Sequence, residues 1–127
     1  MPTIVYYSTF SENTHRFVDH LSPREKIRLG EDGFAAVTSP YVLILPTLSG
    51  GRDRIPSPVI KFLNREENRD LCIGVIGSGD RNFGKFFCRA AEAVAEKLQV
   101  PLLYKFELFG TQVDVGAVEK ILSCLES

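Results

Sequence analysis

The stretch that decides the fold is Ser8-Thr9-Phe10-Ser11-Glu12-Asn13-Thr14, which directly follows the apolar run Ile4-Val5-Tyr6-Tyr7 and directly precedes an amphipathic segment from His15 to Leu21. A buried strand, a hydroxyl-rich turn and the start of a helix, in that order, form an anion site, because the first N–H groups of a helix have no intrahelical partner and carry partial positive charge. The stretch lacks the Gly-Lys-Ser/Thr signature of a Walker loop. It therefore predicts a site that holds one phosphate by hydrogen bonds alone.

The composition indicates one globular domain, residues 1–127. The 127 residues are 44% hydrophobic and 24% charged, which is enough apolar material for one core but not for two. The formal net charge of −1 argues against general nucleic-acid binding. No apolar run reaches the length of a membrane span, and the N-terminus lacks a signal-peptide pattern. We therefore expect a cytoplasmic protein that binds neither nucleic acid nor membrane.

The residue types that most often bind metals are scattered. The spacings of Cys72, Cys88 and Cys124 match no metal-binding motif. These cysteines are expected to be small buried hydrophobic residues in a reducing compartment. His15 and His20 do not share a helix face closely, and both are expected at the surface. No paired carboxylates, catalytic triad or ligand cluster supports a hydrolase or a metal site.

Apolar runs alternate with helical patterns along the chain. Strands are predicted at Ile4–Tyr7, Lys26–Leu29, Tyr41–Leu45, Leu71–Ile76 and Leu102–Phe106. Helices are predicted from His15 to Leu21, from Val59 to Leu63, from about Phe83 to Leu98, and in a last segment with Asp114 as N-cap and Val115, Val118, Leu122 and Leu125 on one face. The polar residues 65–69 are expected to form a solvated bend, and the short link 30–40 leaves little room for a helix.

This alternation predicts an α/β fold, a doubly wound and mainly parallel five-stranded sheet with helices on both faces. In such a sheet, ligands bind beyond the carboxyl ends of the strands, at the point where the strand order reverses. The loops to inspect are therefore residues 8–14, 46–55 and 77–84.

The second of these loops contains adjacent glycines, Gly50 and Gly51, after Pro46-Thr47-Leu48-Ser49. Glycines let a backbone approach a flat ring closely and let a peptide change orientation at little cost. Beside a flavin, a peptide that offers its carbonyl to N5 after reduction could couple redox state to loop shape. An ordinary glycine turn stays open as the alternative.

The third loop is Gly77-Ser78-Gly79-Asp80-Arg81-Asn82-Phe83-Gly84. Its backbone groups and the side chains of Asp80 and Asn82 suit the polar edge of a pyrimidine ring, and Phe83 offers a face for stacking. A plain strand-to-helix turn is again the alternative. Together, the three loops favour a phosphorylated, flat, partly polar ligand, and FMN satisfies all three demands.

Four segments of the sequence resemble those of a known family. The matching segments run in family order, and they are Val5–Thr14, Val59–Asn64, Gly77–Gly84 and Lys105–Thr111. They are similar to those of the NrdI family, the flavodoxin-like FMN proteins that serve class Ib ribonucleotide reductase. The resemblance implies a flavodoxin-like sheet in the order 2-1-3-4-5.

The resemblance also implies which residues bind FMN. The phosphate loop would comprise Ser8, Thr9, Phe10, Ser11, Asn13 and Thr14. The loop on the N5 side of the isoalloxazine would comprise Thr47, Leu48, Ser49, Gly50 and Gly51. The other side of the ring would be wrapped by Ser78, Gly79, Asp80, Asn82, Phe83 and Gly84. The chemistry would take place on the flavin, so no catalytic side chain is expected.

By the same resemblance, the FMN hydroquinone would reduce O2 and pass superoxide to the dimanganese radical-generating subunit of the reductase. Such a protein is an activator rather than a metabolic enzyme, and it also needs a flavin-reducing electron donor. The alternative is a general flavodoxin-type electron carrier. A flavin-free receiver-like module is disfavoured, because Ser8, Thr9, Pro46 and Thr47 stand where its acidic residues belong.

The sequence departs from the family pattern near the expected ring. Asp80 replaces a usual asparagine, and Leu48 replaces a residue that is aromatic in some members, which leaves Phe83 as the expected stacking partner. Three arginines, Arg52, Arg54 and Arg81, lie in the loops that would rim the site. They would either ease full reduction of the flavin and attract superoxide, or form solvated ion pairs with Asp53 and Asp80.

Overall fold

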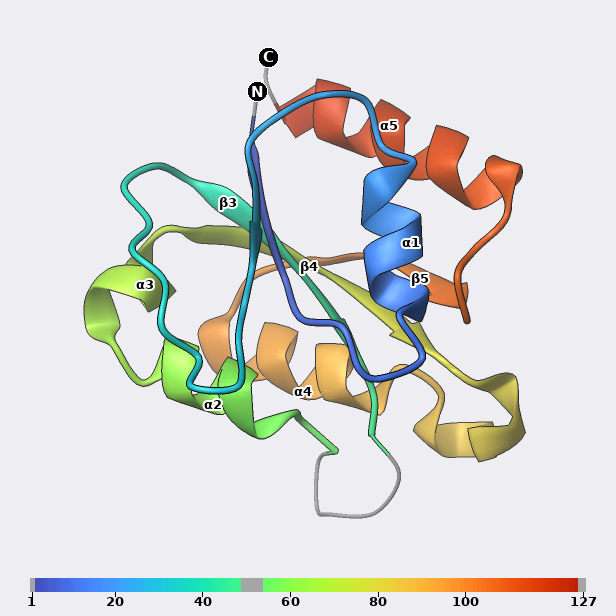
Figure 1. Cartoon of the computed structure of the whole chain (residues 1–127), viewed down its shortest axis with the longest axis horizontal. Coiled ribbons are helices and arrows are strands. Elements are labelled where there is room, and N and C mark those ends of the chain that lie inside the picture. Colours follow the sequence, from blue (N-terminus) through green and yellow to red (C-terminus); the bar gives the residue numbers. More distant parts are fainter. Residues whose placement is uncertain (1, 49–53, 126–127) are drawn as a thin grey trace.

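The computed structural model describes residues 2–48 and 54–125. Its centre is a parallel sheet with the strand order β2-β1-β3-β4-β5 (Figure 1). The strands are β1 (Thr3–Tyr6), β2 (Lys26–Arg28), β3 (Tyr41–Pro46), β4 (Cys72–Gly79) and β5 (Leu102–Glu107). The predicted fold class, strand order and parallel pairing are confirmed.

Helices cover both faces of this sheet (Figure 1). One face carries α1 (Asn13–Asp19) and α5 (Gln112–Leu125). The other face carries α2 (Ser57–Leu63) and α4 (Arg89–Leu98), and the short helix α3 (Glu66–Asp70) follows α2. The link 30–40 contains no helix, as predicted.

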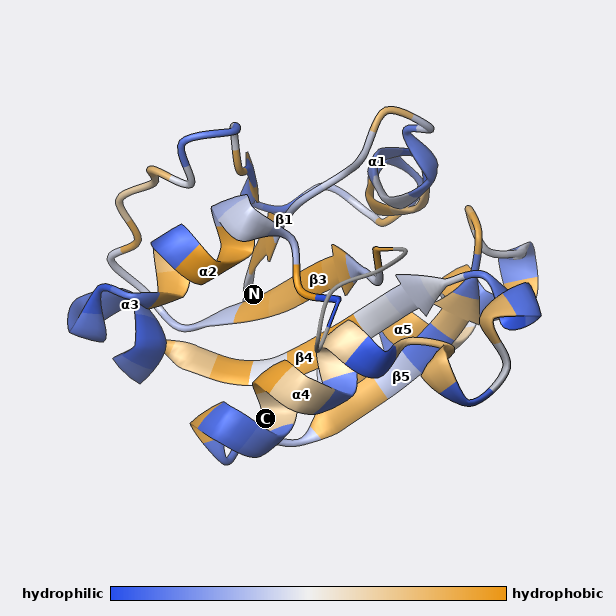
Figure 2. Ribbon diagram, turned by 90° about the horizontal axis from the view of Figure 1, so that it is seen from below, coloured by the Kyte–Doolittle hydropathy of each residue, from blue (hydrophilic) through white to orange (hydrophobic). Residues whose placement is uncertain are grey.

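Alternate residues of the central strands supply two cores. Val5 and Leu43 belong to the core beneath α2 and α4, whereas Ile4 and Ile44 belong to the core beneath α1 and α5. All four side chains are fully buried. A parallel sheet that is covered on both faces needs strands that are apolar throughout, and Figure 2 shows the central strands mainly in the hydrophobic colour. The sheet is therefore a rigid frame for the loops at its carboxyl edge.

The prediction of one helix from Phe83 to Leu98 is wrong in its first part. The chain instead forms the 3₁₀ segment η1 (Arg81–Phe86), and α4 begins only at Arg89. Gly84 has φ 60° and ψ −124°, and Cys88 has φ 57° in the left-handed region. These conformations are incompatible with a continuous α-helix. The break folds the segment after β4 back over the end of the sheet.

Two smaller helix predictions are also wrong. Asp114 lies inside the first turn of α5, and Thr111 takes the capping position. The Thr111 hydroxyl accepts a hydrogen bond from the Asp114 N–H (3.3 Å), while the Asp114 carboxylate accepts from the Thr111 N–H (2.8 Å), which is a capping box. Residues 65–69 fall largely within the helix α3 rather than a bend, although Arg65, Glu66, Glu67 and Arg69 are exposed to solvent as predicted. The buried Asn68 amide donates to the Phe62 carbonyl at 3.0 Å.

Expectations about single side chains are partly correct. Cys72 and Cys88 are buried, but Cys124 is exposed. His15 is half-buried, and its Nδ1 lies 2.7 Å from the Tyr6 hydroxyl oxygen.

No helix within residues 2–48 and 54–125 is both long and apolar enough to cross a membrane.

Candidate functional site

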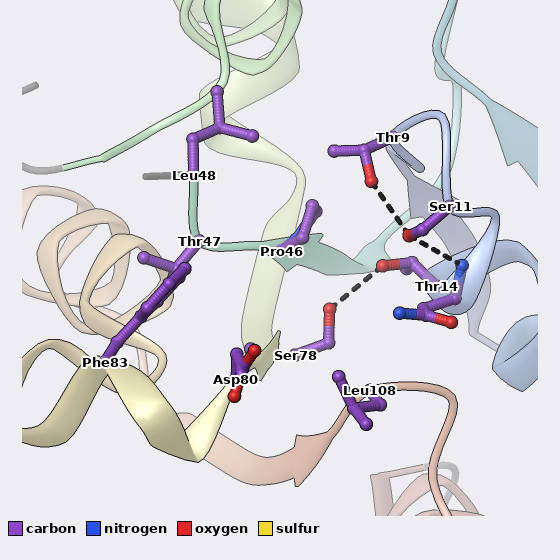
Figure 3. Close-up of a pocket in the computed structure, with 12 residues that line it drawn as sticks. Thr9, Ser11, Thr14, Pro46, Thr47, Leu48, Ser78, Asp80, Phe83 and Leu108 are labelled. Carbon is purple, nitrogen blue, oxygen red and sulfur yellow. Dashed lines mark hydrogen bonds between the residues drawn. The ribbon is translucent and has the colours of Figure 1, made fainter. Parts of the chain in front are cut away.

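The carboxyl ends of the central strands surround a cavity of about 330 Å³ (Figure 3). It lies where β1 neighbours β3, the point at which the strand order reverses and ligands of such sheets bind. The cavity brings together residues from all three predicted loops and from the turn after β5. Its lining residues are Thr9, Ser11, Asn13, Thr14, Pro46, Thr47, Leu48, Ser78, Gly79, Asp80, Phe83 and Leu108.

One side of the cavity consists of hydroxyl groups and backbone amides. The Thr9 and Ser11 hydroxyl oxygens lie 3.2 Å apart, and Ser11 Oγ accepts a weak hydrogen bond from the Asn13 N–H (3.4 Å). No described residue accepts a hydrogen bond from the N–H groups of Thr9, Phe10, Ser11 or Thr14. This side therefore presents neutral donors at the start of α1, where the peptide dipoles also favour an anion.

Two buried hydroxyls hold this side against the rest of the site. Thr14 Oγ1 and Ser78 Oγ lie 2.9 Å apart on the cavity floor and join α1 to β4 (Figure 3). Ser8 lies beneath the loop, where its buried Oγ accepts from the His15 N–H at 3.1 Å. Ser8 thus fixes the first turn of α1 rather than lining the cavity.

Beyond the lining, an ion pair neutralises the acidic residue of the first loop. Glu12 adopts a left-handed conformation (φ 64°) just before α1. Its carboxylate accepts hydrogen bonds from the Arg28 guanidinium on β2. These bonds lower the pKa of the Glu12 carboxyl. The Glu12 charge is therefore held at the β2 edge, by a cation that offsets it.

The second loop is anchored at both of its described ends. The Thr47 hydroxyl accepts a hydrogen bond from the Ala90 N–H (3.0 Å) at the start of α4, and the Thr47 N–H donates to the Ser78 carbonyl (3.1 Å). The Leu48 N–H donates to the Arg54 carbonyl at 3.0 Å, which closes the base of the loop. The predicted contributions of Ser49, Gly50, Gly51, Arg52 and Asp53 lie outside the described residues.

The third loop is shaped by Asp80. Its carboxylate accepts a hydrogen bond from the Asn82 N–H (2.9 Å) and so caps η1. Arg81 pairs with Glu107 instead of Asp80 (Nε to Oε1, 3.5 Å). The alternative in which Arg81 forms an ion pair with Asp80 is therefore not observed. Asp80 is the one carboxylate among the described lining residues, and no lysine or arginine is among them.

The side of the cavity away from Thr9 and Ser11 is apolar. It contains Leu48 and Phe83, whereas Leu108 lies on the far side of Asp80, below Thr14 in the view of Figure 3. Leu108 was not predicted as a site residue. It lies in the turn after β5 with φ 55°, and its N–H donates to the Gly79 carbonyl at 2.9 Å. The signal that could have found it is its position immediately after the last strand, at the same edge of the sheet as the other loops.

Several predicted residues lie near the cavity without lining it. Ser8 is buried below it, and Phe10 is fully exposed. Asn82 and Gly84 are exposed on η1. Pro46, at the end of β3, lines the cavity although it was not predicted. No group of His, Cys, Asp and Glu within the described residues could hold a metal ion.

The donor set fits a phosphorylated heteroaromatic cofactor. Hydroxyls and unpaired amides at one end suit a phosphate, and Leu48 with Phe83 at the other end suits a flat ring. A Cβ on Gly79 would lie 3.1 Å from the Cys88 backbone nitrogen, so glycine at this position lets β4 and the Cys88 turn approach closely.

The sheet order and this site define a flavodoxin-like protein. A search of solved structures agrees, since the chain superposes on a short-chain flavodoxin associated with a bacterial microcompartment with a TM-score of 0.68, covering 98% of this chain and 95% of that one. The sequence identity is 18%, so this likeness concerns the fold.

Within that class, the chain belongs to the NrdI flavodoxin-like family, whose family model matches residues 5–120. The NrdI protein of Mycoplasma genitalium is 48% identical, with 96% of this chain and 83% of the relative covered. The NrdI protein of Cronobacter sakazakii is 47% identical, with 97% and 95% covered. The NrdI protein of an Escherichia coli strain is 49% identical, with 94% and 90% covered. The resemblance seen in the sequence is confirmed.

Proposed function

We propose that this chain binds FMN in the cavity and uses it to activate a class Ib ribonucleotide reductase. One observation carries the proposal. In this NrdI-family chain, a single cavity has hydroxyl groups at one end and an aromatic ring at the other. The phosphate would lie against Thr9, Ser11 and Thr14, and the isoalloxazine between Leu48 and Phe83.

The phosphate end supports binding without a cation. Hydroxyl and amide donors that reach a charged acceptor contribute about 1.5–3 kcal/mol each, so a few such bonds suffice for tight binding. The hydroxyls of Thr9, Ser11 and Thr14 converge there, together with the unpaired N–H groups of the same loop. This arrangement suits a terminal phosphate, and no lysine or arginine is among the described lining residues.

The ring end supports a planar ligand in contact with solvent at one edge. Leu48 and Phe83 supply apolar contact, and the Asp80 carboxylate lies where the polar edge of a ring would pass. Bound FMN supplies one-electron and two-electron redox chemistry. The chain's own contribution is to bind and orient the ring, to keep one edge accessible, and to set the local charge through Asp80.

In the proposed reaction, fully reduced FMN would supply one electron to O2 and form superoxide, and a flavin-reducing donor would supply that electron to the flavin. The residues of this chain would hold the flavin and leave one edge of its ring open to O2. The acceptor would be the dimanganese small subunit of the reductase, where the oxidant assists formation of the tyrosyl radical. This role places the chain in the cytoplasm with its partner. A general electron carrier would use the same cofactor but deliver its electrons to another protein.

An anaerobic reductive titration of the FMN-reconstituted protein, followed by exposure to O2, tests the proposal. We expect tight FMN binding, little accumulation of the one-electron-reduced flavin, and fast superoxide release detected by cytochrome c reduction that superoxide dismutase suppresses. A persistent one-electron-reduced flavin with slow reoxidation would favour the carrier. Failure to retain FMN would overturn both readings.

A second experiment addresses the partner. The FMN-loaded protein is reduced and mixed with the manganese(II)-loaded small subunit, O2 is added, and the tyrosyl radical is quantified by electron paramagnetic resonance. We expect radical formation that depends on this chain and falls when superoxide dismutase is present. A radical yield equal to that of free reduced FMN would contradict the activator role.

A further inference from the structure

The base of the second loop contains a strained arginine. Arg54 has φ 61°, a left-handed conformation that residues with a Cβ seldom adopt. Its carbonyl accepts the Leu48 N–H at 3.0 Å, so Arg54 and Leu48 together close the loop. Strain of this kind persists only where the surroundings over-determine the conformation.

The Arg54 side chain reaches the third loop. Its guanidinium carbon lies 4.3 Å from the centroid of the Phe86 ring and 5.9 Å from that of Phe83. Its Nε is buried and has no hydrogen-bond partner among the described residues. The contact between Arg54 and Phe86 is therefore a cation–π interaction, at a distance that a guanidinium stacked on the ring would also have.

This contact links two sides of the cavity. Leu48 and Phe83 both line it, but they come from different loops and belong to segments that follow different strands. Arg54 is bonded to Leu48 through its backbone and reaches Phe83 and Phe86 through its side chain. Arg54 therefore connects Leu48 to Phe83 without lining the cavity itself.

We propose that Arg54 is a positioning residue of the FMN site, which ties the second loop to η1 and so sets the gap that receives the ring. The proposal rests on the proposed FMN binding. Charge alone does not account for the arrangement, because the Lys85 ammonium already lies 5.3 Å from the Phe86 ring. A planar guanidinium can lie flat on Phe86 while its backbone stays bonded to Leu48, whereas an ammonium cannot stack in this way.

The test compares Arg54→Met and Arg54→Lys with the natural chain. Both variants should raise the Kd for FMN about threefold to tenfold, as expected for the loss of one cation–π contact. Both should also change the visible circular dichroism of the bound flavin, which reports the chiral surroundings of the ring. Arg65→Met is the matched control, because Arg65 lies 4.9 Å from the Phe34 ring, and neither residue lines the cavity. It should leave both measurements unchanged.

A double-mutant cycle with Phe86→Leu shows whether Arg54 acts through Phe86. If it does, Arg54→Met should add little to the loss of FMN affinity in the Phe86→Leu background. Arg54→Gly is a second variant that removes the same guanidinium. Because glycine adopts φ 61° without strain, its backbone can keep the natural conformation at this position. Urea unfolding of each variant confirms that the fold is retained.

The outcomes separate this inference from the proposed function. Natural-like FMN affinity and circular dichroism in Arg54→Met and Arg54→Gly would overturn the positioning role and leave the proposed function intact. A full rescue by Arg54→Lys would also overturn it, because charge would then suffice. Absence of FMN binding by the natural chain would overturn both.

Discussion

The hydroxyl oxygens of Thr14 and Ser78 lie 2.9 Å apart, although the two residues are 64 positions apart in the sequence. Thr14 belongs to the first turn of α1 and Ser78 to β4, and both side chains are buried. Only one of the two O–H groups can donate to the other. No described residue accepts the second proton, so under the proposed function this proton would donate to the phosphate of the ligand.

Replacing Thr14 with Val should weaken FMN binding. Valine keeps the shape of the side chain but removes the hydroxyl, so one hydrogen bond to a charged acceptor is lost, at a cost of about 1.5–3 kcal/mol. This corresponds to a rise in Kd of roughly tenfold to 150-fold. A fluorescence titration with FMN measures the change.

Ser78→Ala is the control for that variant, because it breaks the same internal bond but leaves the Thr14 hydroxyl in place. We expect a smaller loss of affinity than for Thr14→Val. Equal losses would show that the internal bond, rather than a Thr14 contact to phosphate, determines FMN affinity.

Asp80→Asn should make the bound flavin easier to reduce. The Asp80 carboxylate lines the cavity, and its removal relieves repulsion toward an anionic reduced ring. The effect on the reduced state is on the order of 1 kcal/mol, or about 40 mV for a one-electron couple. In the variant, the amide oxygen can still accept the hydrogen bond from the Asn82 N–H, so η1 keeps its cap. Spectroelectrochemistry on both proteins measures the shift, and an unchanged potential would place Asp80 away from the ring.

Gly110→Ala should destabilise the fold by about 2–4 kcal/mol. Gly110 has φ +74°, and a Cβ built on it would lie 2.6 Å from Cδ1 of Phe17. Phe17 is fully buried and stacks on Phe106 with ring centroids 3.8 Å apart, so it has little space to move. Urea unfolding measures the loss.

The matched control is Gly116→Ala on α5, where a Cβ would meet nothing within 4 Å. Alanine in a helix interior is favoured over glycine, so this variant should gain about 0.5–1 kcal/mol of stability. If both variants lost stability equally, the clash with Phe17 would not be the cause in Gly110→Ala.

The capping box of α5 should make stability depend on pH. Burial alone would raise the pKa of Asp114, but hydrogen bonds from the Tyr104 hydroxyl and from Thr111 lower it overall. A lowered folded-state pKa adds stability above the unfolded pKa, and that stability is lost as pH falls through the folded-state value. Asp114→Asn should cost about 0.5–1 kcal/mol at pH 7 after allowance for solvent screening. The difference from the natural chain should shrink below about pH 4. A constant difference across this range in urea unfolding would contradict the carboxylate's role.

Most of the sheet could be predicted, because the continuous apolar runs of its strands indicate that these residues are buried. The run Tyr41–Leu45 is apolar at every position, which a strand covered on both faces requires. Periodicity could not locate the break before α4, since it depends on the backbone conformations of Gly84 and Cys88. A cysteine with positive φ has no sequence signature.

The site was predictable where chemistry is local and unpredictable where it depends on long-range contacts. The hydroxyls of Thr9, Ser11 and Thr14 stand out in the sequence, and they line the cavity. Leu108 is brought there by a backbone bond to Gly79 across two neighbouring strands. Arg81 pairs with Glu107, also on β5, rather than with its neighbour Asp80. Such contacts follow from the strand order, which must be known first.

The outermost strand β2 has a consequence for the behaviour of the chain at high concentration. It comprises only Lys26–Arg28, and an exposed strand edge is a template for pairing with a second chain. The Lys26 ammonium is bound to the Leu21 carbonyl, and Arg28 is bound to Glu12. Charged side chains on so short a strand discourage another strand from adding to it. The sheet thereby resists edge-to-edge aggregation on this side, while its carboxyl edge stays open for a ligand.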